Sequence, residues 1–298
     1  MKVFGISMVR NEVDIVRANI LHHLSLGLDQ LLIIDNGSSD GTEVELQRLG
    51  REDPRVRWSR DDGPYLQGQI TTELAHEARR SGADWVLPID ADEFWYAPGR
   101  VFRRVLSESQ AGALQAQVLN FIQRRSQRES TPEGLLHMTR RASSPVGPPK
   151  HAQDLVNSGK IAFVEKMYQP KWISRPTEEL TIKSGNHRIS GVDGPKETTD
   201  EIICLHAPIR SRASLEARIG WAYRIDEAGF GPGQSKNMRR WGKMTEETIV
   251  ELEWAANSYQ DYFLEVYGEQ HPVIFDPRLR DVVSPWIPRP PSGDDQAV

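Results

Sequence analysis

Apolar runs and helical spacings alternate along the first hundred residues. Short apolar runs are typical of strands buried in a parallel sheet, and apolar residues at every third or fourth position indicate helices. Strands are predicted at 3–9, 31–34, 56–58 and 85–90, and helices at 13–24, at 69–80 and from Thr42, which fits a capping box with Glu45. This alternation predicts an α/β fold with a mostly parallel central sheet, flanking helices and right-handed crossovers.

The pattern beyond residue 100 is less regular. Strands are predicted at 113–122, 160–164, 181–183 and 201–205, and a polar, proline-containing loop or flap at 124–159. Helices are predicted from Ser214 to Ala228 and from Thr245 to Gly268, the second on its amphipathic spacing. The proline-rich tail from Pro285 is expected to be extended or disordered.

Acidic residues gather where the predicted strands end. Asp35 ends the second strand, and Asp90 and Asp92 follow the fourth at positions i and i+2. In an extended strand these two side chains project to the same side. Because ligands of open α/β sheets bind beyond the carboxyl ends of the strands, the two acids predict a site for a hard divalent cation.

Composition narrows the class of protein. The chain has 298 residues, of which 38% are hydrophobic and 27% charged, and its formal net charge is −5. This balance gives no general affinity for nucleic acid or anionic membranes. The single cysteine, Cys204, excludes an intramolecular disulfide and favours a reducing compartment. With no apolar run near 20 residues and no signal-peptide pattern, we expect a cytoplasmic protein without a transmembrane segment.

Three blocks together resemble the glycosyltransferase family 2 pattern, in the branch with an acidic-Glu-Phe ending. They are 8–12, 34–42 and 89–94, with later similarity at 184–188 and 205–210. The resemblance implies a GT-A fold with a Rossmann-like sheet and a helical C-terminal extension. It also implies a nucleoside-diphosphate sugar donor (UDP-, GDP- or dTDP-sugar), Mn²⁺ or Mg²⁺, and inversion at the anomeric carbon.

The same resemblance suggests how the chain is divided. Residues 1–100 would form the half that binds the nucleotide sugar, and residues 101–212 the half on the acceptor side. Residues 213–284 would be the helical extension and 285–298 a disordered tail. The acceptor would be a glycan, a lipid or a small natural product.

The resemblance assigns the metal ligands. Asp92 would bind the ion, Asp90 would lie near the ribose or the ion, and His206 would be a third ligand, which suits Mn²⁺ better than Mg²⁺. The alternative is that the aspartates cap a turn and the histidine is structural. Glu93 would either orient the site or pair with an arginine.

The donor would be bound where the first strands end. Asp35 would contact the base or ribose, Asn11 or Glu12 the base, and Arg10 a phosphate; turn and helix capping are the alternatives. Asp40 is expected to brace the turn. Arg210 and Arg212 are either diphosphate contacts or solvated. The predicted donor-binding residues are Val9, Arg10, Asn11, Glu12, Asp35, Asp90, Ala91 and His187.

An inverting transfer also needs a general base. The chain lacks a clear Glu-Asp block after the metal motif, so Asp193 is the predicted base, with Glu165, Glu178 and Glu179 as alternatives.

The sequence disfavours three other functions. A sugar-nucleotide-forming nucleotidyltransferase is disfavoured because no glycine-rich loop follows the first strand. A dehydrogenase is disfavoured by the absence of G-x-G-x-x-G. A non-catalytic nucleotide-sugar-binding protein on the same scaffold is disfavoured by the intact acids.

Overall fold

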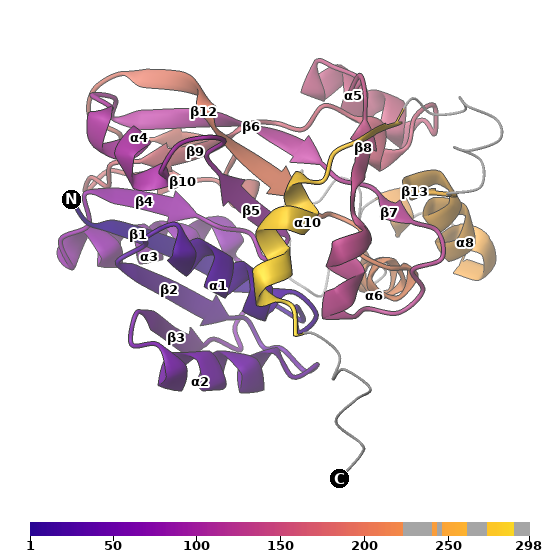
Figure 1. Ribbon diagram of the computed structural model, residues 1–298, viewed down its shortest axis with the longest axis horizontal. Helices are drawn as coiled ribbons and strands as arrows, with labels where there is room; N and C mark the ends of the chain where they lie inside the picture. The colour runs from indigo at the N-terminus through magenta and orange to yellow at the C-terminus, as the bar shows by residue number, and fades with distance from the viewer. Residues whose placement is uncertain (223–239, 243–245, 261–272, 289–298) are drawn as a thin grey trace, which may run out of the picture.

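A single eight-stranded sheet organises the molecule (Figure 1). The computed structural model describes residues 1–222, 240–242, 246–260 and 273–288. The strand order is β3-β2-β1-β4-β9-β6-β12-β5. These strands are β1 (Val3–Val9), β2 (Gln30–Asp35), β3 (Val56–Arg60), β4 (Trp85–Pro88), β5 (Glu93–Tyr96), β6 (Ala113–Asn120), β9 (Lys171–Ser174) and β12 (Lys196–His206).

Most strands run in one direction. β1 is parallel to β2 and β4, β2 to β3, and β6 to β12. β9 is antiparallel to both β4 and β6, and β5 is antiparallel to β12. Six strands therefore end at the same edge, which confirms the α/β fold class with its mostly parallel sheet.

Helices cover both faces of the sheet because each strand alternates its apolar side chains. On one face Phe4, Ile6 and Met8 of β1 pack with α3 (Gln67–Arg80) and the hairpin β10 (Thr181–Ile182) and β11 (Ile189–Ser190). On the other face the larger core includes residues of α1 (Val16–Ser25), α2 (Thr42–Glu52), α4 (Phe102–Glu108) and α10 (Arg278–Val283).

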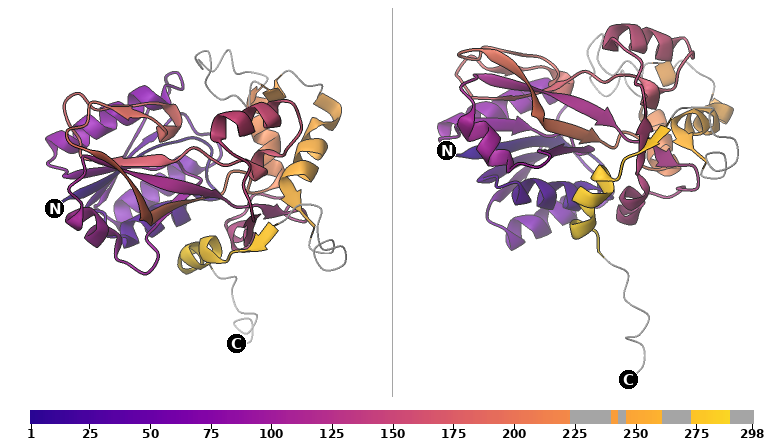
Figure 2. Two further views of the ribbon diagram at one scale, coloured as in Figure 1. Left: turned by 90° about the horizontal axis from the view of Figure 1, so that it is seen from above. Right: turned by 45° about the horizontal axis from the view of Figure 1, so that its top comes forward.

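The expected helical C-terminal extension is present beside the carboxyl ends of the strands (Figure 2). Helices α6 (Arg212–Ala222) and α8 (Glu246–Asn257) pack against each other and share a third apolar cluster with α5 (Pro149–Asn157). Smaller elements complete this region: β7 (Gln123–Arg124), η1 (Pro132–His137), β8 (Arg140–Ala142), η2 (Phe163–Glu165), η3 (Ser184–Asn186), β13 (Ser258–Tyr259), β14 (Val273–Phe275) and η4 (Ser284–Trp286).

Several local predictions were wrong. The predicted flap at 124–159 contains helix α5, which begins at Pro149, where a proline costs no hydrogen bond. Residues 160–164 form no strand, and the short helix η2 begins at Phe163. No side chain caps α2, because the Thr42 hydroxyl donates to Asp40 and accepts the Glu12 N–H. Asp40 braces this turn, as expected.

The C-terminal predictions are met in part. Helix α6 begins at Arg212, where Ser211 and Ser214 exchange hydrogen bonds, and its predicted continuation from 223 to 228 lies outside the described residues. The second helix ends at Asn257, and the predicted stretch from 261 to 268 is also outside them. At the start of the predicted tail, Trp286 packs on the core.

The boundary predicted at residue 100 does not divide the sheet. β5, which precedes it, pairs with β12, and β9 lies between β4 and β6. Residues 1–100 and 101–212 therefore share one sheet.

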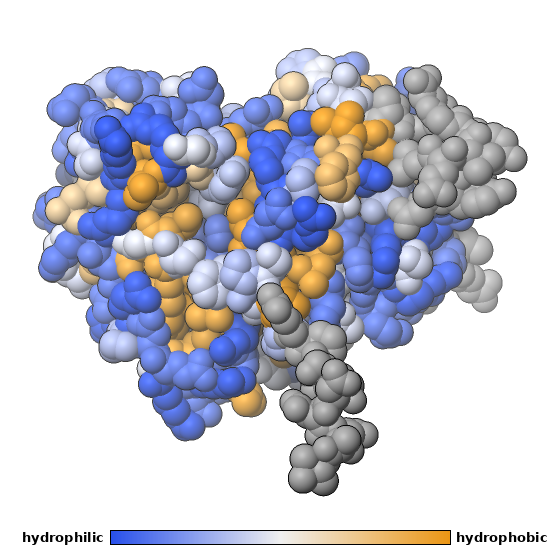
Figure 3. All heavy atoms as spheres, in the orientation of Figure 1, coloured by the Kyte–Doolittle hydropathy of each residue, from blue (hydrophilic) through white to orange (hydrophobic). Residues whose placement is uncertain are grey.

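The outer surface is largely polar on the face shown in Figure 3. Apolar side chains gather there over β14, where Ile274 and Phe275 are 37% and 57% exposed. None of the described helices is both long and apolar enough to span a membrane.

Candidate metal and donor site

The acidic motif forms a turn between two strands. β4 ends at Pro88, and the Glu93 N–H donates to the Asp90 carbonyl oxygen at 3.0 Å before β5 begins. The expectation that Asp90 and Asp92 project to the same side of one extended strand was therefore wrong. The physical reason is topological: β5 pairs with β12 at the sheet edge, so the chain must leave β4 before the acids.

Side chains of helix α1 hold this turn through hydrogen bonds to the backbone of the turn and of β5. The amide of Asn19 donates to the carbonyl oxygens of Glu93 at 2.7 Å and Ala91 at 3.0 Å. His23 accepts the Trp95 N–H at 3.2 Å, and His22 donates to the Trp95 carbonyl oxygen at 2.7 Å. These buried hydrogen bonds fix the turn and the first residues of β5.

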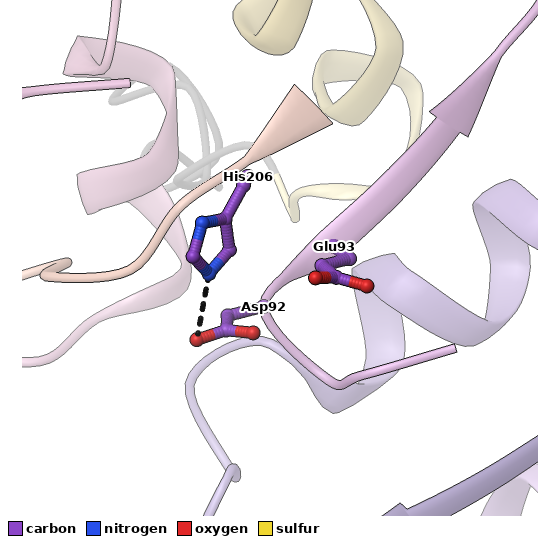
Figure 4. Close-up of side chains that lie close together, drawn as sticks. All are labelled: Asp92, Glu93 and His206. Atoms are coloured by element: carbon purple, nitrogen blue, oxygen red, sulfur yellow. Dashed lines mark ion pairs between the residues drawn. The ribbon is translucent and has the colours of Figure 1, made fainter. Parts of the chain in front are cut away.

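Asp92, Glu93 and His206 lie together at the end of the sheet (Figure 4). Each offers one possible metal-ligating atom, and these atoms all lie within 4.8 Å of one another. Glu93 and His206 are register partners in β5 and β12. The topology therefore brings a histidine from late in the chain to the acidic turn.

The tautomer of His206 is set by Asn120. The Asn120 amide nitrogen donates to the Lys166 carbonyl oxygen at 3.3 Å, so its Oδ1 accepts the proton on His206 Nδ1 at 2.7 Å. Burial lowers the pKa of His206, which favours the neutral ring. Its Nε2 lone pair then faces Asp92 Oδ2 at 3.5 Å, and two facing acceptors are what a bound cation requires.

A buried lysine, Lys171, pairs with the carboxylates of both Asp90 and Glu93. Lys171 of β9 is 1% exposed, and its Nζ lies 2.6 Å from Asp90 Oδ2 and 2.7 Å from Glu93 Oε1. Gln67 and Asn186 donate to the second oxygen of Asp90 at 2.8 and 3.0 Å. Both oxygens of Asp90 thus already have protein donors, and its predicted metal role remains a prediction.

Glu93 keeps one oxygen available. Its Oε2 is buried and has no hydrogen-bond partner among the described residues. Burial raises the pKa of Glu93 to about 8, against the opposing effect of Lys171. A cation shared with Asp92 and His206 would satisfy this oxygen, so the residues present fit a divalent ion.

Two arginines line the same site. Arg218 of α6 donates to Asp92 Oδ2 at 2.8 Å. Arg210 forms a bidentate pair with Asp14, both bonds at 2.8 Å, and lies 2.6 Å from Glu12 Oε2. Burial raises the pKa of Glu12 to about 7, although both arginines act to lower it.

The predicted donor-binding residues at the ends of β1 and β2 mainly hold a loop in place. Asp35 is fully buried, accepts hydrogen bonds from the backbone and hydroxyl of Ser38, and pairs with Arg60 at 3.4 Å. Asn11, in the left-handed region with φ 54°, accepts the Ser39 N–H at 2.8 Å.

Two further donor-binding predictions lie in the same loop region. The Val9 carbonyl oxygen accepts the Asn36 N–H at 2.9 Å. The guanidinium of Arg10 lies 3.9 Å from the ring centroid of Trp221, on helix α6. Neither contact is the helix capping given as the alternative for Arg10, and donor binding by these residues remains a prediction.

His187 reaches the site through Tyr168. The Tyr168 ring lies 4.7 Å from that of His206 and 5.3 Å from that of His187, centroid to centroid. Burial lowers the pKa of His187 to about 2, so its ring is neutral and suited to packing or hydrogen bonding rather than to pairing with a phosphate.

The prediction of Asp193 as general base is not supported. It precedes β12, whereas His206 ends that strand, and its carbonyl oxygen packs against Gly112 at the start of β6. Ten residue steps of a strand span roughly 30 Å, so Asp193 lies at the opposite end of the sheet. Glu178 pairs with Arg79, and Arg212 with Glu216 and Glu251, rather than with site residues.

Sequence reasoning missed several polar residues that build the site: Asn19, Gln67, Asn120, Lys171 and Arg218. Asn186 lies in the 184–188 block of similarity, but no role was predicted for it. Only their convergence on the acidic turn identifies them.

Comparisons with known proteins were made on sequence and on structure. No protein-family model matches the chain. Over 94 residues, 31% of the chain, it is 34% identical to glycosyltransferase family 92 protein At1g27200 of Arabidopsis thaliana. Over 95 residues it is 34% identical to glycosyltransferase family 92 protein Os08g0121900 of Oryza sativa subsp. japonica. The matched part is 16% of each relative, so the chain spans only a small fraction of their length.

Two solved structures are distantly similar. Residues 1–349 of S. aureus TarS align with a TM-score of 0.41 at 11% identity, over 91% of this chain and 76% of that one. The mannosyltransferase PcManGT from Pyrobaculum calidifontis, in complex with GDP-Man and Mn²⁺, aligns with a TM-score of 0.41 at 14% identity, over 95% and 73%. Scores at this level carry no inference about function.

Proposed function

We propose that this protein is a glycosyltransferase with a GT-A fold that moves a sugar from a nucleoside-diphosphate sugar to an acceptor hydroxyl, with inversion. The observation that carries the proposal is the convergence of Asp92, Glu93 and His206, with the His206 lone pair facing Asp92. The sequence similarity to proteins named as glycosyltransferases supports the same reading.

The proposed cofactor is Mn²⁺ or Mg²⁺, held by Asp92 and His206 with Oε2 of Glu93. A neutral imidazole among the ligands favours Mn²⁺ over Mg²⁺. When bound, such an ion neutralises charge on the diphosphate leaving group. Asn120 would keep the Nε2 lone pair of His206 available to such an ion, and Lys171 holds Asp90 and Oε1 of Glu93.

Arg210 and Arg218 add positive charge to the site, besides Lys171 and the proposed metal ion. Arg218 lies beside Asp92, and Arg210 is held rigidly by Asp14. Positive groups placed before the reaction stabilise charge as it develops on the departing nucleoside diphosphate. The hydroxyl of the acceptor, a glycan, lipid or small natural product, would attack the opposite face of the anomeric carbon. Its proton would pass to a base while the bond to the nucleoside diphosphate breaks.

A thermal-shift panel tests the proposal. UDP-, GDP- and dTDP-sugars would each be added with and without Mn²⁺, because a ligand that binds the folded state raises its melting temperature. We expect a Mn²⁺-dependent shift with one nucleotide family, and transfer or hydrolysis of that donor. Asp92→Asn should lose the Mn²⁺ dependence and keep its fold.

Two other results would overturn the proposal in different directions. Shifts with nucleoside triphosphates but with no sugar nucleotide would indicate a nucleotidyltransferase. A shift with a sugar nucleotide that is neither hydrolysed nor transferred with any acceptor class would indicate a non-catalytic binding protein.

A further inference from the structure

One oxygen atom of the site faces two different partners. Asp92 Oδ2 is 2.8 Å from Nη2 of Arg218 and 3.5 Å from Nε2 of His206. A cation bound between Asp92 and His206 would therefore lie close to the Arg218 guanidinium. Two positive groups at such a distance repel each other, so the ion and Arg218 compete for Asp92.

Arg218 differs from the other cations of the site in its freedom to move. Its side chain is 33% exposed, whereas those of Lys171 and Arg210 are 1% and 5% exposed. Lys171 is held by two carboxylates, and Arg210 by a bidentate pair. In the part of the chain that the structure describes, the other hydrogen bond of Arg218 goes to the Pro208 carbonyl oxygen, and Glu12 also attracts it electrostatically. Among the described residues of the site, it is the cation best placed to change partners.

Charge favours such a change when the donor arrives. A divalent ion at Asp92 would take over the neutralisation that Arg218 supplies there. A diphosphate bound to that ion would bring new oxygens to the exposed side of the site. A planar guanidinium binds phosphate oxygens in a bidentate manner, which a lysine does not reproduce.

We propose that Arg218 is an exchange residue: it pairs with Asp92 while the site is empty and transfers to the diphosphate of the donor when the metal takes Asp92. The inference rests on the proposed function. It adds a diphosphate-binding residue on α6, and it links the position of that helix to occupation of the site.

The test measures two affinities that should move in opposite directions in Arg218→Gln. The first is that of Mn²⁺ alone, followed by the electron paramagnetic resonance signal of the free ion. The second is that of the manganese–pyrophosphate complex, followed by calorimetry. We expect Mn²⁺ to bind about tenfold more tightly and manganese pyrophosphate about tenfold more weakly, the size of one charge-assisted contact.

Two further variants separate this role from a structural one. Arg218→Lys keeps the charge but not the fork, so Mn²⁺ affinity should stay near that of the wild type while pyrophosphate binding weakens. Arg212→Gln removes another arginine of α6, paired with Glu216 and Glu251, and should change neither affinity.

The possible failures are distinguishable. Wild-type protein that binds Mn²⁺, with an Arg218→Gln variant that binds it no more tightly, would overturn the exchange and leave the proposed function standing. An unchanged affinity for manganese pyrophosphate in that variant would overturn the diphosphate contact. Wild-type protein that takes up no Mn²⁺ would overturn the metal site itself, and the exchange with it.

Discussion

The side-chain amide of Asn19 donates a 2.7 Å hydrogen bond to the backbone carbonyl oxygen of Glu93. The same nitrogen lies 3.0 Å from the carbonyl oxygen of Ala91. A residue of the first helix therefore fixes the backbone on either side of Asp92, although it contacts no proposed metal-ligating atom. Groups that orient ligands in this way commonly affect metal affinity 10–100-fold, by order of magnitude.

We predict that Asn19→Asp weakens Mn²⁺ binding by about tenfold or more. The substitution keeps the shape of the side chain but points a carboxylate at carbonyl oxygens, so the turn must shift. A Mn²⁺ titration of the purified variant measures the effect. Ser25→Ala, which removes a hydroxyl bonded only within α1, is the matched control. Equal affinities in wild type and Asn19→Asp would show that the turn does not depend on this clamp.

We predict that Asp193→Asn retains turnover within about twofold of the wild type, whereas Asp92→Asn loses at least about a hundredfold. The reason is position, since Asp193 lies at the opposite end of β12 from His206. Initial rates of donor hydrolysis with Mn²⁺ compare the two variants. A large loss in Asp193→Asn with an unchanged melting temperature would restore it as the base.

His22 makes stability depend on pH. Burial lowers its pKa to about 4, so the folded state resists the proton that the unfolded chain takes up near pH 6.5. The stability due to its neutral form is complete above pH 6.5 and falls as the pH drops toward 4, by about 3 kcal/mol. We therefore expect the stability of the wild type relative to His22→Gln to fall by about 3 kcal/mol between pH 7 and pH 4.

Urea unfolding of both proteins at several pH values between 7 and 4 measures this difference. Gln keeps an amide donor for the Trp95 carbonyl oxygen, so the comparison isolates the titration. A difference that stays constant with pH would mean that His22 does not titrate in this range.

Asp276 ties the C-terminal segment to the body of the protein. It accepts hydrogen bonds from Arg141 at 2.7 Å and from the Arg278 side chain at 2.8 Å. Burial opposes its ionisation, but these arginines outweigh that effect and lower its pKa to about 2. Its stabilising contribution is therefore present above about pH 4 and is lost as the pH falls toward 2.

We predict that Asp276→Asn destabilises the docking of 273–288 by about 1–3 kcal/mol at pH 7. Faster hydrogen exchange in β14 and α10, with unchanged protection of β1, would be the expected signature. Asp281→Asn serves as the control, because the exposed Asp281 pairs only with the neighbouring Arg280. If Asp276→Asn left the protection of β14 and α10 as it is in the wild type, the result would contradict the prediction.

The sequence predicted best what local pattern determines. β1, β2 and α3 carry apolar spacings that only their own residues set. β1 lies at its predicted bounds, and the ends of β2 and α3 differ from their predicted positions by at most two residues. β9 escaped prediction because it has four residues and begins with a lysine. The burial of Lys171 is intelligible only once Asp90 and Glu93 lie beside it.

Part of the site could also be predicted from the sequence. The spacing of Asp90 and Asp92 predicted a cation site, the family resemblance implied His206 as a third ligand, and the structure brings Asp92 and His206 together. It groups Glu93, rather than Asp90, with them, because Asp90 and Asp92 lie in the turn between β4 and β5 and Glu93 begins β5. Arg218, 126 residues from Asp92, could not be linked to it without the fold.

The pairing of β5 with β12 also bears on how the protein is made. Until residue 206 has left the ribosome, β5 has no strand beside it, and its apolar residues Phe94 and Trp95 have nothing to bury them from that side. The acidic turn meanwhile lacks its histidine. An emerging chain of a hundred residues would therefore carry an unpaired, aggregation-prone strand. Such a strand is a natural target for a chaperone that shields apolar segments during synthesis.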